Sequence, residues 1–484
     1  MNKKQRVSFK IILAIDNGFY NAGDKLPSLR DVAVEEGVSL YTALNAYNDL
    51  VSQGIIENRP KVGYFVPAIQ SRDTEALLRE YSKAVPVRQK ANITYDEKIY
   101  EHYVAHAKLR HGDDCLQFSR EDVNEEYFGS IVYDNFQKAA RNTPATKTWK
   151  FFAETESKLA SHIARWMLDY DCRFRKDHIV MMNNSVEAIM YAVRACYSPG
   201  KVLGIESPGH MSFAFCARFL ALNYVELRCD PDSGLCVDSL VGAVDCGIEF
   251  FAILTSSSNS SPTGAIMPEE NKRRLVEVCV KNTIPIIEYD GFGRLGYLQH
   301  RCNPIKSLEH ESVIYISDFS KMFGVGVSLS FMECGKFTES MLFLKTLCGV
   351  RVPTDEQLAI SINLMTDNIS EHIKKLSTDI NCSVELFSKT LKESVPRSVR
   401  IKAFRGGPFL WIEFPEGAVV KDFGLFAFQN NIHIAPGRLF SKLPEVSGYF
   451  RINCCSTKNP KRIVADAKAL GKVITEFLGA WDKN

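Results

Sequence analysis

Residues 24–66 decide the fold of the amino-terminal part of the chain, and they read DKLPSLRDVAVEEGVSLYTALNAYNDLVSQGIIENRPKVGYFV. Ser28 precedes a short helical stretch and Ser39 precedes a longer one, and serine is a preferred residue at the N-cap of a helix. Gly37 lies between them and allows a tight turn. The end of the stretch alternates apolar and polar residues around a basic turn, which is typical of a two-stranded hairpin.

A further helix precedes this stretch, because apolar residues recur at helical spacing at Val7, Ile11, Ile12 and Ile15. A helix, a helix–turn–helix and a hairpin form the layout of a winged helix, which we expect over residues 1–67. The motifs are similar to those of the GntR winged-helix family, and this resemblance implies binding to double-stranded DNA. The residues that carry it are Leu26, Pro27, Ser28, Arg30, Gly37, Ser39, Thr42, Ala46, Tyr47, Leu50, Gly54 and Gly63.

The expected DNA contacts come from the second helix of this motif and from the hairpin turn. A recognition helix that begins at Ser39 brings the side chains of its first turns to base edges in the major groove, while helix amides and basic side chains hold phosphates. Leu40 departs from the family, in which arginine often follows the serine. The alternative is a winged helix that contacts protein. The predicted DNA-binding residues are Ser28, Arg30, Ser39, Tyr41, Thr42, Asn45, Lys61 and Gly63.

The composition is that of a globular protein with more than one domain. A chain of 484 residues is too long for one small domain. Its content of 45% hydrophobic and 24% charged residues argues against extended disorder. The net charge of +2 gives no strong membrane or nucleic-acid signal. No run of about 18 apolar residues predicts a membrane span, and the start lacks a secretory signal. The 14 cysteines include no C-x-x-C pair, so we expect reduced thiols, no metal site and a cytoplasmic location.

From about residue 111 onward, short apolar runs alternate with amphipathic helices. This pattern predicts an α/β domain with a mostly parallel sheet and helices on both faces. The section from about 350 onward mixes helices with strands and predicts a smaller α+β subdomain. Residues 68–110 are charged and are expected to be a linker, so residues 111–484 form the second domain. The predicted strands of the large sheet lie at 178–182, 201–206, 250–256, 285–290 and 312–318.

The segment SDFSKMFGVG at 317–326 resembles the Ser-x-Ser-Lys motif of class I and II aminotransferases, which have the fold-type I architecture. With a GntR-like domain in front, the whole chain resembles the MocR-type regulators. In that family an aminotransferase-like domain binds pyridoxal 5'-phosphate (PLP), senses a ligand and controls the attached DNA-binding domain. Four further segments follow the family order, namely MMNNSVEAI at 181–189, ESPGHMSF at 206–213, SSPTG at 260–264 and YFRINCC at 449–455.

The resemblance implies a role for each matching residue. Lys321 takes the position of the lysine that condenses with the PLP aldehyde. Ser320 and Ser185 take the positions of phosphate donors, and His210 takes that of the aromatic residue that stacks on the pyridine ring. Arg451 takes the position of the guanidinium that grips an α-carboxylate of substrate or effector. The alternatives are a surface lysine at Lys321 and a structural ion pair at Arg451.

Several positions depart from the family pattern. Asp290, the candidate partner of the pyridine nitrogen, is one residue out of register, and a shift of one residue turns a side chain to the other face of a strand unless a bulge corrects it. Losing the phosphate arginine removes a charge-assisted contact worth about 1.5–3 kcal/mol. The departing positions are Asn184 for glycine, His210 for the stacking aromatic, Ser261 for asparagine, Ser328 for arginine, and Tyr289 and Phe292 for the aspartate and tyrosine of the ring.

These observations favour a DNA-binding transcriptional regulator whose aminotransferase-like domain senses PLP, a vitamer or an amino compound with little or no turnover. A second hypothesis is a regulator whose effector domain no longer binds PLP and serves dimerisation. A third is an active aminotransferase with an accessory DNA-binding domain, which the altered catalytic set disfavours. Aminotransferase sites of this type lie at a dimer interface, so the resemblance also implies a homodimer.

Overall fold

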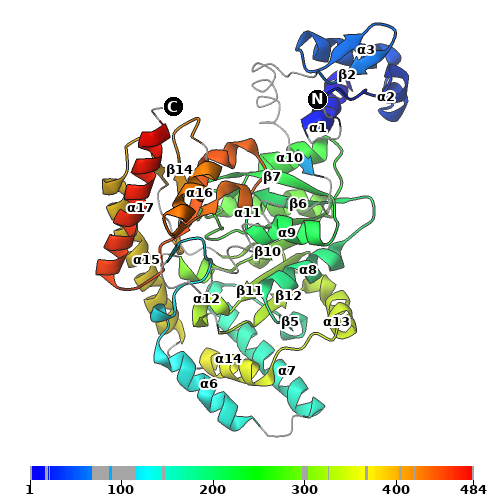
Figure 1. The fold of residues 1–484 in the computed structure, drawn as a ribbon. Helices are drawn as coiled ribbons and strands as arrows, with labels where there is room; N and C mark the ends of the chain where they lie inside the picture. The colour runs from blue at the N-terminus through cyan, green and yellow to red at the C-terminus, as the bar shows by residue number, and fades with distance from the viewer. Residues whose placement is uncertain are drawn as a thin grey trace.

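The computed structural model describes most of the chain, and the fold is drawn in Figure 1. The described residues are 3–16, 20, 22–67, 87–89, 115–143, 148–296, 303–324, 326–365, 369–402, 406–418 and 420–481.

The amino-terminal domain is a winged helix, as predicted. The aliphatic residues Val7, Ile11 and Leu50 pack in its core with Tyr47, whose ring meets Tyr64 edge-on at 4.7 Å between centroids. The two strands pair antiparallel, with Asn58 opposite Tyr64. Its elements are α1 (Lys3–Asp16), α2 (Leu29–Glu35), α3 (Leu40–Ser52), β1 (Glu57–Arg59) and β2 (Gly63–Phe65).

A nine-stranded, mostly parallel sheet forms the centre of the large domain, in the order β3-β7-β6-β9-β10-β11-β12-β5 with β8 paired to β7. The four successive pairs from β7 to β11 are parallel, and the remaining pairs are antiparallel. All five predicted strands are present. The strands are β3 (Val87–Gln89), β5 (Ile179–Met182), β6 (Val202–Ser207), β7 (Tyr224–Asp230), β8 (Gly234–Leu235), β9 (Phe250–Thr255), β10 (Ile286–Tyr289), β11 (Val313–Asp318) and β12 (Ser330–Glu333).

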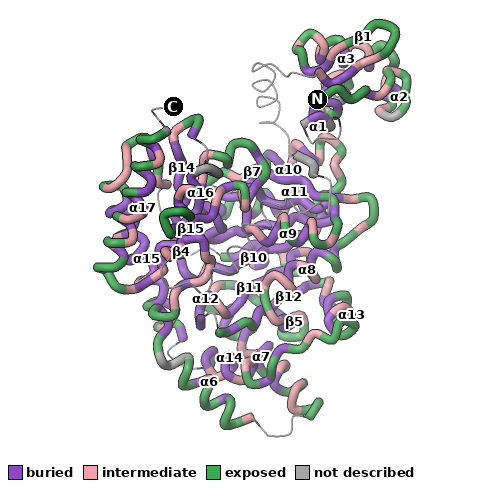
Figure 2. The backbone as a smooth tube through the Cα atoms, viewed as in Figure 1, coloured by how far each residue is buried: buried purple, intermediate pink, exposed green. Residues whose placement is uncertain are grey.

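Both faces of this sheet are covered, because successive side chains of a strand point to opposite faces. In β5, Val180 and Met182 belong to the core shared with α8, whereas Met181 belongs to the core that α7 and α14 close. Figure 2 shows the strands buried in the middle of the domain. The helices of this part are α6 (Ser130–Asn142), α7 (Trp149–Met167), α8 (Ser185–Cys196), α9 (Met211–Phe219), α10 (Val237–Asp245), α11 (Glu269–Lys281), α12 (Ser320–Phe323), α13 (Thr338–Leu347) and α14 (Thr354–Met365).

The carboxy-terminal part forms the predicted α+β subdomain. Its antiparallel sheet has the order β13-β14-β17-β16, and apolar residues of the long helices α15 and α17 pack in the same core. The elements are α15 (Ile369–Ser394), β13 (Arg400–Ile401), β14 (Phe409–Glu413), α16 (Val420–Gln429), β15 (Ile432–His433), β16 (Ala435–Pro436), β17 (Tyr449–Asn453) and α17 (Pro460–Trp481).

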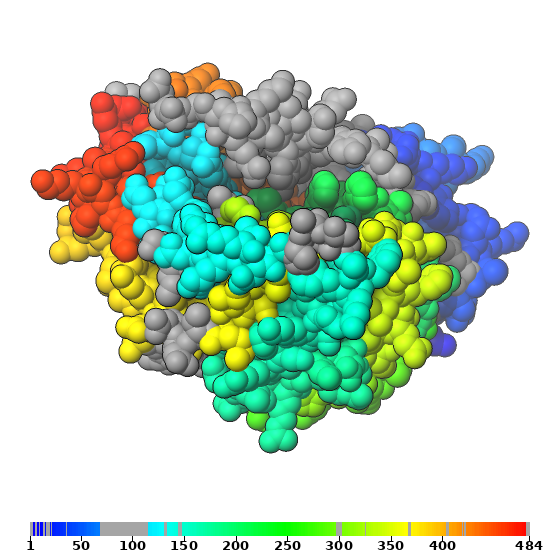
Figure 3. Space-filling model, turned by 90° about the horizontal axis from the view of Figure 1, so that it is seen from below, coloured from blue at the N-terminus to red at the C-terminus, as the bar shows by residue number. Residues whose placement is uncertain are grey.

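Two short strands, β3 and β4 (Leu116–Gln117), precede α6 and pair with strands far along the chain. β4 pairs parallel with β15, so the chain joins the carboxy-terminal subdomain after the edge strand β3 and before the other strands of the large sheet. Figure 3 shows residues 115–143 in cyan beside the red surface of α17 and the yellow surface of α14 and α15. β3 pairs antiparallel with β7 at the edge of the large sheet and lies within the predicted 68–110 linker, most of which lies outside the described residues.

Candidate functional site

The recognition helix α3 presents an exposed face at its start. The Ser39 hydroxyl caps the helix by accepting from the amide of Thr42 at 3.1 Å. Tyr41 is 72% exposed, and Leu40 beside it is 50% exposed. Asn45 lies four residues after Tyr41, so the two share one face of the helix. This geometry is compatible with the predicted contacts to base edges, which stay predictions.

The predicted phosphate and wing residues are also at the surface. Arg30 and Lys61 are exposed. Ser28 is the N-cap of α2, where its hydroxyl accepts from the amide of Asp31 at 3.3 Å. Gly63 begins β2 at a φ of 129°, a conformation that favours glycine, and an added Cβ would meet Lys25 Cε at 3.1 Å. The backbone conformation therefore favours glycine at the base of the wing.

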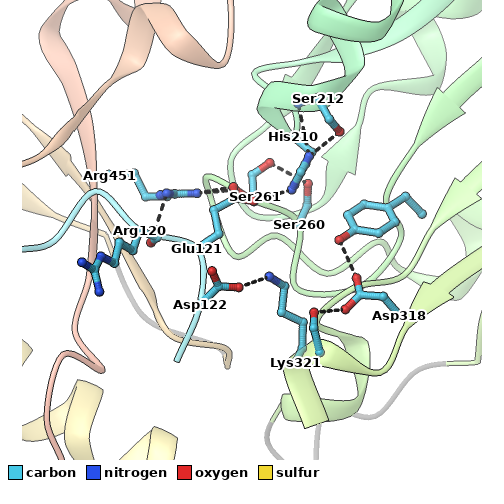
Figure 4. A network of polar contacts seen from close by, with 12 residues as sticks. Arg120, Glu121, Asp122, His210, Ser212, Ser260, Ser261, Asp318, Lys321 and Arg451 are labelled. Atoms are coloured by element: carbon cyan, nitrogen blue, oxygen red, sulfur yellow. Dashed lines mark hydrogen bonds and ion pairs between the residues drawn. The ribbon is translucent and has the colours of Figure 1, made fainter. Parts of the chain in front are cut away.

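The second candidate site lies between the large sheet and the carboxy-terminal subdomain. Lys321 lies in α12, directly after β11, while Arg451 lies in β17 and His210 caps α9. Figure 4 shows these three side chains and Ser261 converging on one place. The same place also receives Glu121 and Asp122, from the stretch that follows β4. These two acidic residues were not predicted from the sequence as part of the site.

Arg451 is bound by the protein itself. Its side chain is fully buried, and the guanidinium carbon lies 4.3 Å from the ring centroid of Phe409 and 4.9 Å from that of Phe440. Its Nη1 donates to Glu121 Oε1 at 2.6 Å and to Ser261 Oγ at 2.9 Å. The α-carboxylate position of the family therefore holds the carboxylate of Glu121, so Arg451 is part of an internal ion pair.

Glu121 also contacts the predicted stacking residue. Its Oε2 lies 2.8 Å from Nε2 of His210, whose Nδ1 lies 2.6 Å from the hydroxyl of Ser212. Burial acts to raise the pKa of Glu121, but the nearby His210, Arg451 and Lys321 hold it well below its usual value. Glu121 is therefore an ionised carboxylate held between two side chains that the family uses for substrate and cofactor.

Lys321 is paired in the same way. Its Nζ donates to Asp122 Oδ1 at 2.8 Å, and only 10% of its side chain is exposed. Burial acts to lower the pKa of Lys321, but Asp122, Asp318 and Glu121 outweigh it and raise the pKa above the usual lysine value. An amine must be neutral to attack an aldehyde. This pairing therefore opposes aldimine formation.

The main chain of the acidic stretch is fixed on both sides of Glu121. Asn453 Nδ2 donates to the carbonyl of Arg120 at 3.2 Å and to that of Asp122 at 2.9 Å. Arg451 Nη2 donates to the carbonyl of Ser119 at 2.7 Å. Because β17 supplies both Asn453 and Arg451, one strand holds the backbone and binds the Glu121 side chain.

The predicted phosphate donors surround an acidic side chain. Ser320 donates a short hydrogen bond to Asp318 Oδ1, and the Tyr289 hydroxyl donates to Asp318 Oδ2 at 3.1 Å. Burial raises the pKa of Tyr289 well above its usual value, and Asp318 raises it further, while a hydrogen bond with Ser185 acts in the other direction. Ser185 and Ser320 therefore lie on either side of a tyrosine–aspartate pair.

The start of α8 is satisfied by its own side chains. The Asn184 side chain accepts from the amide of Glu187 at 2.9 Å, and Glu187 Oε2 accepts from the amide of Asn183 at 2.9 Å. Ser328, in the position of the family's phosphate arginine, is exposed, and its amide donates to Glu356. A phosphate placed beside Ser320 would face the Asp318 carboxylate without that arginine. The residues present do not fit the phosphate of PLP.

Asp290 belongs to a different group of contacts. Its carboxylate accepts from the Tyr315 hydroxyl at 2.7 Å and from the amide of Gly293 at 2.9 Å. Tyr289, one residue earlier, faces the candidate site, with its ring 4.9 Å from that of His210 between centroids. The alternation along the strand thus brings Tyr289, in place of Asp290, to the cluster around His210.

Comparison with known families covers both domains. Residues 3–66 match the family described as bacterial regulatory proteins, gntR family, and residues 123–466 match aminotransferase class I and II. The chain belongs to the aminotransferase class I and II family. Together with the winged helix, this assignment confirms the predicted MocR-type architecture. The chain is therefore a DNA-binding transcriptional regulator with an aminotransferase-like domain, a fold that is typically PLP-dependent.

Both transcriptional regulators and aminotransferases are similar to this chain. Two uncharacterized HTH-type transcriptional regulators of Escherichia coli K12 align along nearly all of it. YdcR is 26% identical over 99% of this chain and 100% of its own length, and YjiR is 25% identical over 94% and 95%. The structure of LysN, the α-aminoadipate aminotransferase of Thermus thermophilus complexed with N-(5'-phosphopyridoxyl)-L-leucine, covers 78% of this chain and 98% of its own at a TM-score of 0.68 and 17% identity. That likeness shows a shared fold.

Two further findings concern the described residues alone. None of their helices is both long and apolar enough to cross a membrane. Their His, Cys, Asp and Glu side chains form no group that could hold a metal ion.

Proposed function

We propose that this chain is a regulator whose aminotransferase-like domain controls DNA binding in response to a ligand and catalyses no transamination. One observation carries the proposal: Glu121 and Asp122 form ion pairs with Arg451 and Lys321, the two side chains that an aminotransferase needs for its substrate and cofactor. Arg451 is paired with Glu121 at 2.6 Å, and Lys321 is paired with Asp122 at 2.8 Å. Removing one partner of a buried ion pair costs about 3–5 kcal/mol. A substrate that brings one carboxylate can replace only one of these partners, so it does not free both cations.

The contacts around the phosphate position support the hypothesis of a regulator that works without PLP over the hypothesis of a PLP sensor. The Asp318 carboxylate accepts from Ser320, a predicted phosphate donor. Tyr289 also replaces the aspartate that would face the pyridine nitrogen. The proposed assembly is a homodimer formed by residues 111–484, by analogy with the fold, which acts on DNA in the cytoplasm.

The enzymatic part of the proposal is tested on the purified full chain. We expect no aldimine absorbance band after addition of excess PLP. We also expect no keto-acid product from a panel of amino acids with 2-oxoglutarate or pyruvate. Lys321→Ala is the matched control, because any genuine aldimine band or turnover depends on this amine. Sustained turnover by the native chain that Lys321→Ala abolishes would overturn the proposal in favour of an active aminotransferase.

The regulatory part is tested by DNA binding of the same preparation. Fluorescence anisotropy with labelled duplex DNA at several salt concentrations is expected to show affinity that falls as salt rises, because bound cations are released from the phosphates. A native chain that binds no duplex at low salt would contradict the proposed role.

A further inference from the structure

We infer that Arg451 and Lys321 form a two-cation site for a small dicarboxylate, which binds by replacing the carboxylates of Glu121 and Asp122. This inference rests on the proposed function and names the chemical class of the ligand. It depends on the contacts that the protein makes with itself. Two neighbouring residues supply one carboxylate each, and each carboxylate pairs with a different buried cation.

The cations are more deeply buried than the carboxylates that cover them. The side chain of Arg451 is 0% exposed and that of Lys321 is 10% exposed, whereas the values are 18% for Glu121 and 37% for Asp122. Solvent therefore reaches the acidic side chains before it reaches the basic ones. An anion that arrives from solvent meets the two groups that it has to replace.

The replacement needs only side-chain rotation. Asn453 holds the main-chain carbonyls on both sides of Glu121, and Arg451 is held between the rings of Phe409 and Phe440. The backbone and the guanidinium therefore stay in place while the Glu121 and Asp122 side chains rotate outward. Rotamer changes of partly exposed side chains are among the fast motions of a protein.

The charges favour a ligand with two carboxylates. A monocarboxylate that replaces Glu121 leaves Asp122 on Lys321 and places the displaced Glu121 carboxylate close to an added anion. A dicarboxylate restores a partner to both Arg451 and Lys321, so neither buried cation is left unpaired. Ser261 Oγ and His210 Nε2, which now contact Glu121, supply further polar contacts for the incoming carboxylate.

Isothermal titration of the full chain with glutarate tests this inference, with butyrate as the matched monocarboxylate. Glu121→Gln keeps the shape of the internal group but removes its charge. Glutarate binds only when the Glu121 side chain has rotated away from Arg451, and apparent affinity is proportional to the fraction of molecules in that arrangement. We therefore expect Glu121→Gln to bind glutarate at least about tenfold more tightly than the native chain. Glu125→Gln, at an exposed glutamate of the same stretch, is expected to bind as the native chain does.

A second variant shows whether the anion binds at the two cations. Arg451→Gln combined with Glu121→Gln leaves no unpaired charge at this position, so it is expected to fold and to lose the gain in glutarate affinity. Equal glutarate affinity of Glu121→Gln and the native chain would overturn the inference. So would tight binding by the double variant, or butyrate binding as tight as glutarate binding. DNA binding is measured separately, so these results leave the proposed regulatory role standing.

Discussion

Replacing Arg451 by methionine tests how much the internal ion pair stabilises the large domain. Methionine keeps much of the contact with Phe409 and Phe440 but removes the charge and the hydrogen bonds to Glu121 and Ser261. It leaves the Glu121 carboxylate, whose side chain is only 18% exposed, without its guanidinium partner. Because loss of one partner of a buried pair costs about 3–5 kcal/mol, we expect the free energy of unfolding to fall by that amount.

Urea unfolding followed by circular dichroism measures this loss, and an exposed pair provides the control. Arg273 and Glu269 lie 2.8 Å apart with side chains 62% and 48% exposed, so Arg273→Met is expected to cost at most about 1 kcal/mol. If Arg451→Met cost no more than Arg273→Met, the pair with Glu121 would not stabilise the domain and our reasoning would be refuted.

The same variant has a defined pH dependence. The pKa of Glu121 is lower in the folded chain than in the unfolded chain, so its stabilisation is present above the unfolded pKa and is lost as the pH falls through the folded pKa. The difference between the native chain and Arg451→Met is therefore expected to be largest near pH 7 and to narrow below about pH 4, near the unfolded glutamate value. A difference that widened on acidification would contradict the assigned pair.

Three further predictions concern the DNA-binding domain, and a fourth concerns assembly. Arg30→Ala is expected to weaken binding to every duplex and to reduce the slope of log affinity against log salt by about 1, as anisotropy will show. Tyr41→Ala is expected to change sequence preference in a binding-site selection, and unchanged preference would remove it from base contact. Gly63→Ala is expected to lower the melting temperature of the winged helix, because of its φ of 129° and the 3.1 Å approach to Lys25, and an unchanged melting temperature would contradict this. Removal of residues 1–75 is expected to leave a dimer at micromolar concentration by analytical ultracentrifugation, and a monomer would count against the homodimer.

The fold could be predicted largely from the sequence, because its main strands are continuous apolar runs. Buried parallel strands need apolar side chains on both faces, which makes runs such as 250–256 and 312–318 visible. The strands β3, β7, β8 and β12 were not predicted. Val87–Gln89 (β3) is a short edge strand in a charged stretch and is stabilised by pairing with β7. The β-propensity of so short a segment does not reveal that it pairs with a strand far along the chain.

The candidate site could be predicted only in part. Lys321, Arg451, His210 and Ser261 come together as their motifs indicated. Glu121 was missed because its partner Arg451 lies 330 residues further along the chain. A local sequence pattern does not reveal a contact between residues so far apart. One signal was available: Glu121 and Asp122 follow closely after Phe118, a fully buried residue next to β4.

The pairing of β3 with β7 sets a limit on where the DNA-binding domain can reach. Between Pro67, at the end of the winged helix, and Val87, at the sheet edge, there are 20 steps along the chain. A chain spans at most about 3.3–3.6 Å per residue, so this connection measures at most about 70 Å whatever its conformation. Without the β3 anchor, the connection would continue to Cys115 and reach more than twice as far. In the proposed homodimer, the pairing of β3 with β7 would therefore limit the separation of the two operator half-sites that both chains can occupy together.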